Sequence, residues 1–333
     1  MEITILSAAV LLMLSAPSFC GEKSIYGVDN RLDFFAAPAE LQALSDSVVS
    51  FWNPISLSKL NSGGVKLNLL NFGKRMNLCP GEKFSEQASG GDSSGVLVGD
   101  DLVLTAGHVI ENDEQCGYTT VLFGFSIKGM GGKAPDKIPP GDVYRCVRIV
   151  KRFFADEPAI LPAGQTYGPD FALIQLDRKV AGHKPLTIDR SAGLKNGDGI
   201  FIIGYPWGLP LKVAGDAVVR DFSPPATFVA NVDNFNGNSG SPVFSARTGQ
   251  IEGILVRGDG PDFVKTSEGC NKTTVFSQAG GLGSIVTKIG TVSSYIPKLR
   301  GEKSYKDVPG VTGIDPSGMR LPAGLRSGDM NFN

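Results

Sequence analysis

The sequence has little of what metal sites, nucleic-acid surfaces and membrane spans require. It contains two histidines, His108 and His183, and no Cys-x-x-Cys pair, so a metal site is not expected. Lys and Arg (32) balance Asp and Glu (33) to a net charge of −1, which gives no reason to expect binding to nucleic acid or to an anionic membrane surface. No run of about 18 apolar residues follows the N-terminal segment, so no integral membrane span is expected.

Glycine and proline, by contrast, are abundant, with 43 Gly and 21 Pro among 333 residues. Hydrophobic residues make up 41% and charged residues 20%, as in ordinary globular proteins. So many turn-forming residues favour an all-β protein over a helical one. The length leaves room for two lobes of ordinary size with a substantial core.

Residues 1–20 have the pattern of a secretion signal, since a short apolar run from Ile5 to Leu14 precedes small residues. Glu2, and the lack of Lys or Arg before the apolar run, disagree with this pattern, and a buried N-terminal strand is the alternative. Cleavage after Ser18 and cleavage after Cys20 both stay open. We therefore expect a secreted or periplasmic protein.

Composition divides the rest of the chain. Residues 21–45 form an N-terminal arm or pro-segment with a short helix after Pro38, and residues 46–300 form the main domain. Its first lobe spans about residues 46–182 and includes 47–52 and 65–70 as its first strands, and its second lobe spans about 183–300. Residues 301–333 are rich in Gly and Pro without an apolar period, and we expect them to be an exposed, disordered tail.

Four cysteines follow the signal-like segment: Cys79, Cys116, Cys146 and Cys270. In an exported chain four cysteines indicate two disulfides, for which three pairings are open. The alternative is buried, reduced cysteine.

A serine in a tight glycine turn is the main chemical feature, in Gly237-Asn238-Ser239-Gly240-Ser241-Pro242. A serine hydroxyl needs a base that takes its proton and donors that stabilise the oxyanion formed on attack. Glycines can turn the N–H groups of Gly237 and Ser239 toward one point, as an oxyanion hole. Ser241 is the rival nucleophile, but it begins the next strand and lacks the Gly-x-Ser turn.

Two strand-like segments supply the base and its partner. Leu102 to His108 reads as a strand that ends on a histidine, and Asp170 to Ile174 as a strand that begins on an aspartate. His108 would act as general base and then as general acid, while Asp170 would hold its tautomer. Asp177 is the rival aspartate, but its place at the strand end indicates a surface charge. His183, the other histidine, is expected to be solvated.

The order His108, Asp170, Ser239 is that of chymotrypsin-like peptidases, not of subtilisins or α/β-hydrolases. Together with Thr105-Ala106-Gly107 and Gly204-Tyr205-Pro206, these motifs resemble those of bacterial secreted trypsin-like serine peptidases, on the branch nearest the glutamyl endopeptidases. The resemblance implies an all-β fold of two six-stranded antiparallel barrels with a short C-terminal helix. It also implies peptide-bond hydrolysis through an acyl-enzyme, without a metal or organic cofactor.

The resemblance also suggests specificity residues. By counting back from the nucleophile, Asp233 stands where trypsin has the aspartate at the base of its specificity pocket, which would favour cleavage after Lys or Arg. In the alternative, Asp233 caps a turn and faces away from the pocket. Glutamyl endopeptidases use a histidine in the cleft-wall strand, and that place is filled here by an aliphatic residue. The expected substrate-binding residues of this wall are Leu255, Val256, Arg257 and Gly258.

Two departures from trypsin concern activation and cross-linking. Asn238 replaces the aspartate that pairs with the new N-terminal amine after zymogen cleavage, so activation must differ. Ser93 or Ser94, and Val109, replace the cysteines that many trypsin-like enzymes bridge beside the histidine.

We expect a monomer acting on a protein or peptide substrate. The alternative is a pseudoprotease that binds peptides or partners without cleaving them, against which the intact triad argues.

Overall fold

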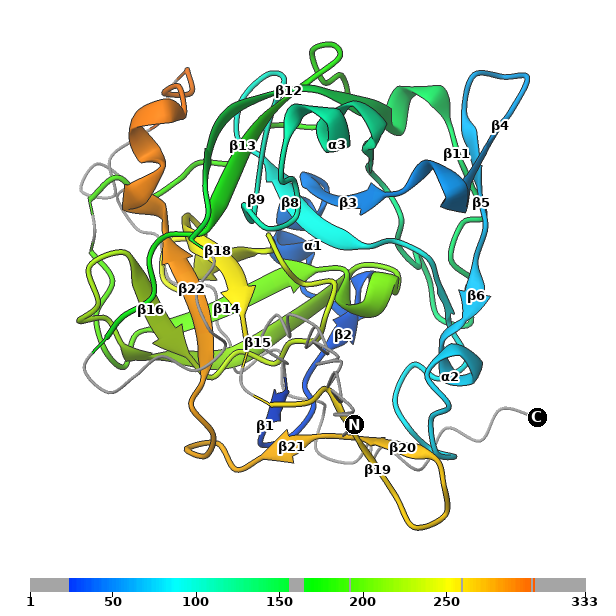
Figure 1. Ribbon diagram of the computed structural model, residues 1–333, viewed down its shortest axis with the longest axis vertical. Coiled ribbons are helices and arrows are strands. Elements are labelled where there is room, and N and C mark those ends of the chain that lie inside the picture. The colour runs from blue at the N-terminus through cyan, green and yellow to red at the C-terminus, as the bar shows by residue number, and fades with distance from the viewer. Residues whose placement is uncertain (1–23, 156–164, 192, 259, 301, 303–333) are drawn as a thin grey trace, which may run out of the picture.

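The computed structural model describes residues 24–155, 165–191, 193–258, 260–300 and 302 (Figure 1). Two antiparallel barrels make up most of it, the first at the top of the view and the second at the lower left. The predicted all-β class with two six-stranded barrels is confirmed. The signal prediction for residues 1–20 lies outside the described residues, and so does the tail prediction for residues 301–333 except for Glu302.

The first barrel closes in the order β10-β12-β13-β9-β8-β3, and its pairings are antiparallel. Its strands are β3 (Val48–Trp52), β8 (Ser93–Leu97), β9 (Leu102–Thr105), β10 (Thr120–Leu122), β12 (Val143–Phe153) and β13 (Phe171–Leu176). β8 and β9 form a hairpin, in which the Val98 N–H donates to the Leu102 carbonyl across the turn at 2.9 Å.

The prediction that residues 65–70 belong to the first barrel is wrong. β5 (Val65–Leu67) pairs instead with β4 (Leu57–Lys59) and β11 (Lys137–Ile138) in a separate three-stranded sheet. Its alternation of buried, exposed and buried residues fits a half-buried strand in either sheet. The alternation of apolar and polar residues therefore predicts that a strand forms here, but not which strands it pairs with.

The second barrel closes because β14 pairs with both β15 and β17. Its strands are β14 (Gly199–Gly204), β15 (Lys212–Asp221), β16 (Thr227–Ala230), β17 (Pro242–Ser245), β18 (Ile251–Arg257) and β22 (Ser284–Lys288). β2 (Leu32–Asp33), from the N-terminal segment, adds to the outside of β15. The second barrel thus incorporates a strand from the start of the described chain.

Short elements connect and flank the barrels. The helices are η1 (Phe34–Ala36), α1 (Ala39–Ser45), η2 (Pro54–Ser56), α2 (Phe72–Arg75), α3 (Asp113–Tyr118), η3 (Pro140–Asp142), η4 (Pro206–Gly208), η5 (Ile289–Thr291) and η6 (Ser293–Tyr295). The remaining strands are β1 (Ile25–Tyr26), β6 (Leu70–Asn71), β7 (Ala88–Ser89), β19 (Phe263–Lys265), β20 (Asn271–Thr273) and β21 (Val275–Phe276). The helix predicted after Pro38 is α1. The helix predicted near the C-terminal end consists of 3-10 turns, and Pro297 follows them.

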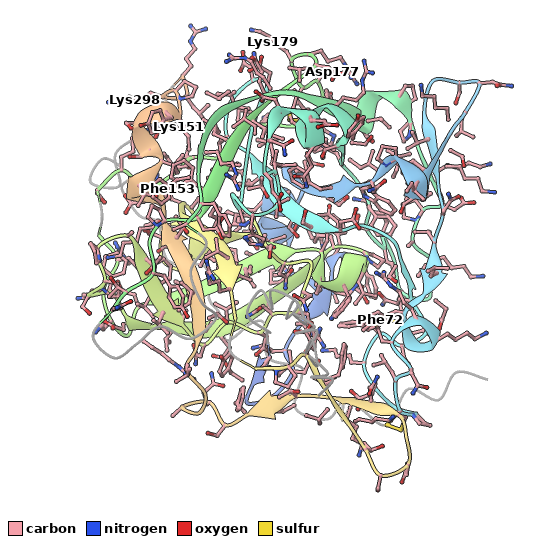
Figure 2. All side chains as sticks on the ribbon, viewed as in Figure 1. Phe72, Lys151, Phe153, Asp177, Lys179 and Lys298 are labelled. Carbon is pink, nitrogen blue, oxygen red and sulfur yellow. A yellow bond between two sulfur atoms is a disulfide. The ribbon has the colours of Figure 1, made fainter. Side chains whose placement is uncertain are left out.

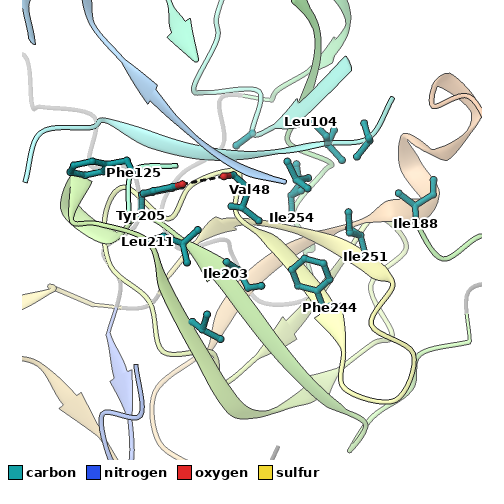
Figure 3. Close-up of a cluster of buried hydrophobic side chains, with 14 of the residues drawn as sticks. Val48, Leu104, Phe125, Ile188, Ile203, Tyr205, Leu211, Phe244, Ile251 and Ile254 are labelled. Atoms are coloured by element: carbon teal, nitrogen blue, oxygen red, sulfur yellow. Dashed lines mark hydrogen bonds between the residues drawn. The ribbon is translucent and has the colours of Figure 1, made fainter. Parts of the chain in front are cut away.

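One hydrophobic cluster spans both barrels (Figure 3). Val48 and Leu104 of the first barrel and Ile203, Phe244 and Ile254 of the second belong to it and are at most 2% exposed. The Tyr205 hydroxyl donates to the Val48 carbonyl at 3.0 Å across this cluster. Because each such side chain contributes about 1.5–3 kcal/mol when fully buried, the cluster fixes how the two barrels sit.

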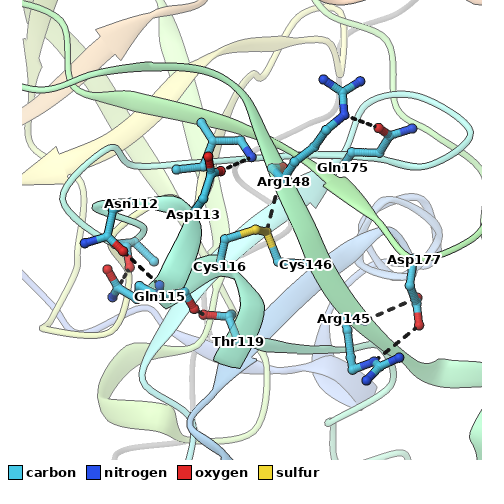
Figure 4. The surroundings of a disulfide bond; sticks show 12 residues. Asn112, Asp113, Gln115, Cys116, Thr119, Arg145, Cys146, Arg148, Gln175 and Asp177 are labelled. Atoms are coloured by element: carbon cyan, nitrogen blue, oxygen red, sulfur yellow. Dashed lines mark hydrogen bonds and ion pairs between the residues drawn. A yellow bond between two sulfur atoms is a disulfide. The ribbon is translucent and has the colours of Figure 1, made fainter.

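Two disulfides resolve the pairing that the sequence left open. Cys79 bonds Cys270, which joins the segment after α2 to the residue before β20. Cys116 of α3 bonds Cys146 of β12, within the first barrel (Figure 4). The alternative of reduced cysteines is wrong. Among the described helices none is both long and apolar enough to cross a lipid bilayer.

Candidate active site

The end of β9 and the start of β13 lie side by side, because Thr105 pairs with Ala172. This register brings His108, just past β9, next to Asp170, the residue before β13. His108 Nδ1 and Asp170 Oδ2 are 2.7 Å apart. Two of the residues predicted from sequence therefore form a close pair.

The carboxylate of Asp170 is held on both oxygens. Its Oδ1 accepts the backbone N–H of Gly107 at 2.6 Å and that of His108 at 3.1 Å. Asp170 is 2% exposed, and a carboxylate can only accept hydrogen bonds. The proton of the imidazole therefore lies on Nδ1, which leaves Nε2 as the acceptor that a general base needs.

The second barrel fixes the backbone of the same aspartate. Thr287 of β22 accepts the Asp170 N–H through Oγ1 at 3.0 Å, and its hydroxyl is 3.0 Å from the Asp170 carbonyl. Gly107 has no room for a side chain, since a Cβ there would collide with the Phe153 carbonyl. The His108–Asp170 pair is thus set by contacts from both barrels.

The glycine turn with Ser239 packs on the end of β9. Gly237 and Gly240 have φ of 89° and 83°, a region that favours glycine. A Cβ on Gly240 would collide with the Ser94 carbonyl and the Thr105 Oγ1. The Ser239 carbonyl also accepts the Ser94 N–H at 3.0 Å. The serine turn therefore lies against the strand end that leads to His108.

The carbonyls around Ser239 determine where its neighbouring N–H groups point. The Asn236 carbonyl accepts the Trp207 N–H, and the Asn238 carbonyl accepts the Ser241 N–H. In a trans peptide the N–H points opposite to the carbonyl. The N–H groups of Gly237 and Ser239 therefore point away from these partners, and Gly237 N–H has no acceptor within the described part of the chain. This arrangement suits an oxyanion hole.

Ser94 is a residue of the site whose contacts the sequence did not predict. Its hydroxyl donates to the Gly237 carbonyl at 2.8 Å and accepts the Tyr205 N–H at 2.9 Å. Its own carbonyl accepts the Thr105 hydroxyl at 2.7 Å. The available signal was a serine at one of the two places where trypsin-like enzymes carry a cysteine beside the active site. Ser94 thus joins the first barrel to the serine turn by hydrogen bonds.

Asp233 lies under the N-terminal segment. Its Oδ1 accepts the Tyr26 N–H at 2.7 Å, and its Oδ2 accepts the Asn30 N–H at 3.3 Å. Asp233 is 3% exposed, and burial, together with the charge of Asp29, raises its pKa to about 7. This geometry favours the alternative, in which the carboxylate binds a turn, over a pocket that selects Lys or Arg.

The side chains of Leu255 and Val256 point into the protein core, at 0% and 1% exposure. The two side chains therefore pack in the core, and the expectation that this strand forms a wall of the substrate cleft stays a prediction. Their place in a central strand explains this packing, since β18 pairs with β17 and β22 on its two sides. Main-chain contacts of β18 instead support the serine turn, because the Leu255 carbonyl accepts the Gly240 N–H at 2.8 Å.

Arg257 and Gly258 lie at the end of the same strand. The Arg257 guanidinium carbon is 5.0 Å from the centre of the Tyr167 ring and 5.9 Å from that of Phe154. The Phe154 ring centre is in turn 6.1 Å from that of His108. Arg257 therefore contacts the rings of Tyr167 and Phe154, and the Phe154 ring lies beside the imidazole. Gly258 is partly buried next to it.

The rival residues have structural partners. Asp177 forms ion pairs with Arg145 at 3.7 Å and Arg178 at 3.2 Å on the outer surface (Figures 2 and 4). His183 is not simply solvated, which corrects the sequence prediction, because it lies between Asp46 at 2.9 Å and Asp142 at 3.2 Å. Within the described ranges, no group of three or more His, Cys, Asp or Glu side chains could hold a metal ion.

One comparison with known proteins, a scan against family models, agrees with this fold. Residues 93–254 match a family model described as a trypsin-like peptidase domain. A search of curated proteins finds no match. Among solved structures, the chain is similar to the inactive form of the Rv3671c protease, at 15% identity and a TM-score of 0.40, covering 78% of this chain and 92% of that one. A second Rv3671c structure, an inactive mutant from M. tuberculosis H37Rv, is similar at 14% identity and a TM-score of 0.42. The match covers 81% of this chain and 94% of that one.

The VesB protease of Vibrio cholerae is also similar, at 14% identity and a TM-score of 0.46, with 80% of this chain and 66% of that one covered. These likenesses are distant. The fold assignment therefore rests on the strand pairing and on the family model. The likeness to glutamyl endopeptidases in particular stays a prediction.

Proposed function

We propose that this chain is a serine endopeptidase with His108, Asp170 and Ser239 as its catalytic triad, which is supported by the match of residues 93–254 to a family model described as a trypsin-like peptidase domain. The observation that carries the proposal is the 2.7 Å contact between His108 and Asp170. Two backbone N–H groups orient this carboxylate, and the turn that carries Ser239 packs on the strand end leading to the histidine.

The chemistry follows from these groups. Ser239 Oγ attacks the carbonyl carbon of the peptide bond while His108 Nε2 takes the hydroxyl proton. The oxyanion is stabilised by the N–H groups of Gly237 and Ser239, and Asp170 stabilises the imidazolium. The C–N bond then breaks as His108 returns the proton to the leaving amine. Water then attacks the acyl-enzyme carbonyl while His108 takes its proton; the bond to Ser239 Oγ breaks, His108 returns the proton to Oγ, and the carboxylic product leaves.

The substrate class is protein or peptide, with no preference for basic residues included in the proposal. That preference depended on Asp233, whose oxygens accept N–H groups of the N-terminal segment. Two disulfides suit an oxidising compartment, which supports the proposal that the chain is secreted or periplasmic.

A fluorophosphonate probe tests the nucleophile, because it labels only a serine activated by a base and an oxyanion hole. We expect wild-type protein to be labelled on Ser239, as located by peptide mass spectrometry. Ser239→Ala should not be labelled and should lose about 10⁴-fold or more in kcat on peptide substrates.

Ser241→Ala is the matched control, since it removes a second hydroxyl from the same turn. It should still be labelled on Ser239. A folded wild-type protein that is never labelled and cleaves nothing would instead support the pseudoprotease alternative.

A further inference from the structure

The segment that leads into the serine turn has no regular partner strand. We refer to residues 232–236 as the pre-nucleophile loop; they lie between β16, which ends at Ala230, and the turn with Ser239. Buried backbone groups of such a loop still require partners. Several contacts to this loop come from residues 24–33, a part of the predicted N-terminal segment 21–45, and from here on the name N-terminal arm means residues 24–33 only.

The arm contacts the loop through both backbone and side-chain groups. The Tyr26 and Asn30 N–H groups donate to Asp233, and the Asn234 N–H donates to the Ser24 carbonyl at 3.2 Å. The pairing joins parts of the chain that are more than 200 residues apart (207 and 203 positions for the two contacts to Asp233). The arm therefore supplies the donors to the Asp233 carboxylate and the acceptor of the Asn234 N–H, while the Asn236 N–H donates to Asp262 Oδ2 at 3.0 Å.

Arg31 adds a stacking contact to the next residue of the loop. Its guanidinium carbon lies 4.2 Å from the centre of the Phe235 ring, and the residue is 2% exposed. Asp29 binds the same guanidinium at 2.9 and 2.5 Å. Burial opposes ionisation of Asp29, but Arg31 and Lys83 hold its pKa at about 2. The charged end of the arm is thus fixed over Phe235.

The arm itself is attached to the second barrel independently of the loop. β1 pairs in parallel with β21, and β2 pairs with β15. The Asn30 Nδ2 donates to the Gly215 carbonyl at 2.7 Å. Figure 1 shows β1 beside β21 and β2 beside β15. The arm can therefore act as a rigid support for the loop.

The loop connects directly to the expected oxyanion donor. The Phe235 carbonyl accepts the Asn238 N–H at 3.0 Å, and the Asn236 carbonyl accepts the Trp207 N–H. A shift of the loop would rotate the peptide between Asn236 and Gly237, and with it the Gly237 N–H. The position of the arm is thus coupled to the geometry of the oxyanion hole.

We propose that the N-terminal arm positions the pre-nucleophile loop and the oxyanion-hole N–H of Gly237, so that activity requires the arm but not the cleavage of a pro-segment. The proposal rests on the proposed peptidase function. Its groups are two backbone N–H groups and the Arg31 side chain, none of which is created by proteolysis. Asp233 is then a positioning residue, because it accepts the hydrogen bonds of the arm. Asn238 needs no charge, because no new N-terminal amine has to be paired.

Hydrogen exchange by mass spectrometry on the whole chain tests the positioning without using activity. In Asp233→Ala, both arm N–H groups lose their acceptor. We expect amide exchange in residues 234–238 to become at least about tenfold faster than in wild type. The rate of fluorophosphonate labelling should fall about 10–100-fold, since losing one oxyanion donor costs about 10²–10³ in kcat.

Asp189→Ala is the matched control. Asp189 is also buried in the second-barrel half of the chain, at 6% exposure, and accepts the N–H groups of Ser191 at 2.8 Å and Gly193 at 3.2 Å. Its loss should leave exchange in residues 234–238 and the labelling rate within about twofold of wild type. Equal changes in both variants would mean a general loss of stability and would overturn the proposal.

Asn30→Ala provides a milder variant if Asp233→Ala does not fold. It removes the bond from the arm to the Gly215 carbonyl but keeps the backbone N–H that contacts Asp233. Exchange in residues 234–238 should rise in the same direction by about threefold. Unchanged exchange in the loop while exchange in the arm rises would overturn the proposal. Absence of labelling in wild type would refute the peptidase function alone, because the exchange result does not depend on it.

Discussion

At the scale of single residues, the proposed role of Asp170 is to hold the imidazole proton of His108 on Nδ1. In Asp170→Asn the side chain keeps its size, but an amide nitrogen can replace the acceptor near His108 Nδ1. The histidine would then hold the wrong tautomer, and kcat should fall about 10⁴-fold. Steady-state kinetics on a peptide substrate measures this effect.

Asp177→Asn is the control for that measurement. Asp177 lies at the other end of β13 and pairs with Arg145 and Arg178. Because exposed ion pairs contribute about 0–1 kcal/mol, this change should leave kcat unaltered. A larger loss in Asp177→Asn than in Asp170→Asn would contradict the assignment of the triad.

Ser94 offers a second prediction at this scale. Ser94→Ala removes the bond to the Gly237 carbonyl and leaves the Tyr205 N–H without its acceptor. An unsatisfied buried group costs about 1–3 kcal/mol, and here the cost should appear at the oxyanion hole. We expect kcat to fall about 10–100-fold with KM changed less than threefold.

Ser50→Ala separates this effect from a general loss of stability. Ser50 is also fully buried in the first barrel, where its hydroxyl accepts the Trp52 Nε1–H at 2.8 Å and donates to the Leu122 carbonyl at 3.4 Å. It should lower the melting temperature without lowering kcat. If Ser94→Thr, which keeps the hydroxyl, does not recover kcat, the positioning role of Ser94 is refuted.

The sequence predicted some residues of the site better than others, for a physical reason. His108 and Asp170 each adjoin a strand in the local sequence, so the pairing of two strands was enough to bring them together. The surroundings of Asp233 depend on Tyr26, which is 207 positions away. Counting from the nucleophile could not show that the arm occupies this carboxylate.

At the scale of elements, β18 carries a buried carboxyl that should make stability depend on pH. Glu252 is 6% exposed. Burial, followed by the charge of Asp189, raises its pKa to about 8. The folded state therefore favours the protonated form, whereas the unfolded chain ionises near the ordinary value of 4.5. Stability should be fully present below about pH 4.5 and decrease as the pH rises toward 8.

Glu252→Gln tests this prediction, because glutamine is neutral at every pH and can still donate to Asp189. We expect the variant to be more stable than wild type at pH 8 by about 1–3 kcal/mol and nearly equal at pH 4.5. Urea unfolding at the two pH values measures the difference. A stability difference that does not change with pH would refute the assignment of the buried proton to Glu252.

Elements with strong local signals were predicted, and those defined by distant contacts were not. The hairpin of β8 and β9 follows from its turn residues, and α1 from the residues after Pro38. α3 was not predicted, although Asn112 caps it by accepting the Gln115 N–H at 2.9 Å. Its six residues include a disulfide-bonded cysteine and pack on β12. Tertiary contacts, rather than a helical period of apolar residues in the sequence, therefore stabilise it.

At the scale of the whole molecule, the proposed triad is divided between the barrels. His108 follows β9 and Asp170 precedes β13, both of which belong to the first barrel. Ser239 instead precedes β17 of the second barrel. The shared hydrophobic cluster and the Cys79–Cys270 disulfide both join the two halves. The sequence alone could not predict which cysteines pair. The pairing depends on how the segment after α2 packs against the loop before β20.

The two disulfides should contribute unequally to stability. A cross-link restricts the unfolded chain more when it closes a longer loop. Cys79–Cys270 spans 191 positions and Cys116–Cys146 spans 30. The loop-entropy relation gives about 5 kcal/mol for the longer loop and about 3.6 kcal/mol for the shorter one. We therefore expect the variant with Cys79→Ser and Cys270→Ser to lose about 1–2 kcal/mol more than the variant with Cys116→Ser and Cys146→Ser.

Chemical unfolding of both double variants, each compared with wild type, measures this difference. Replacing both cysteines of a pair avoids free thiols, so each variant serves as the control for the other. The Cys116–Cys146 bond lies inside the longer loop and shortens it by at most 30 of 191 positions, which changes the expected entropy little because the dependence is logarithmic. If losing Cys116–Cys146 costs more, local packing of α3 on β12 outweighs chain entropy, and the expected order is wrong.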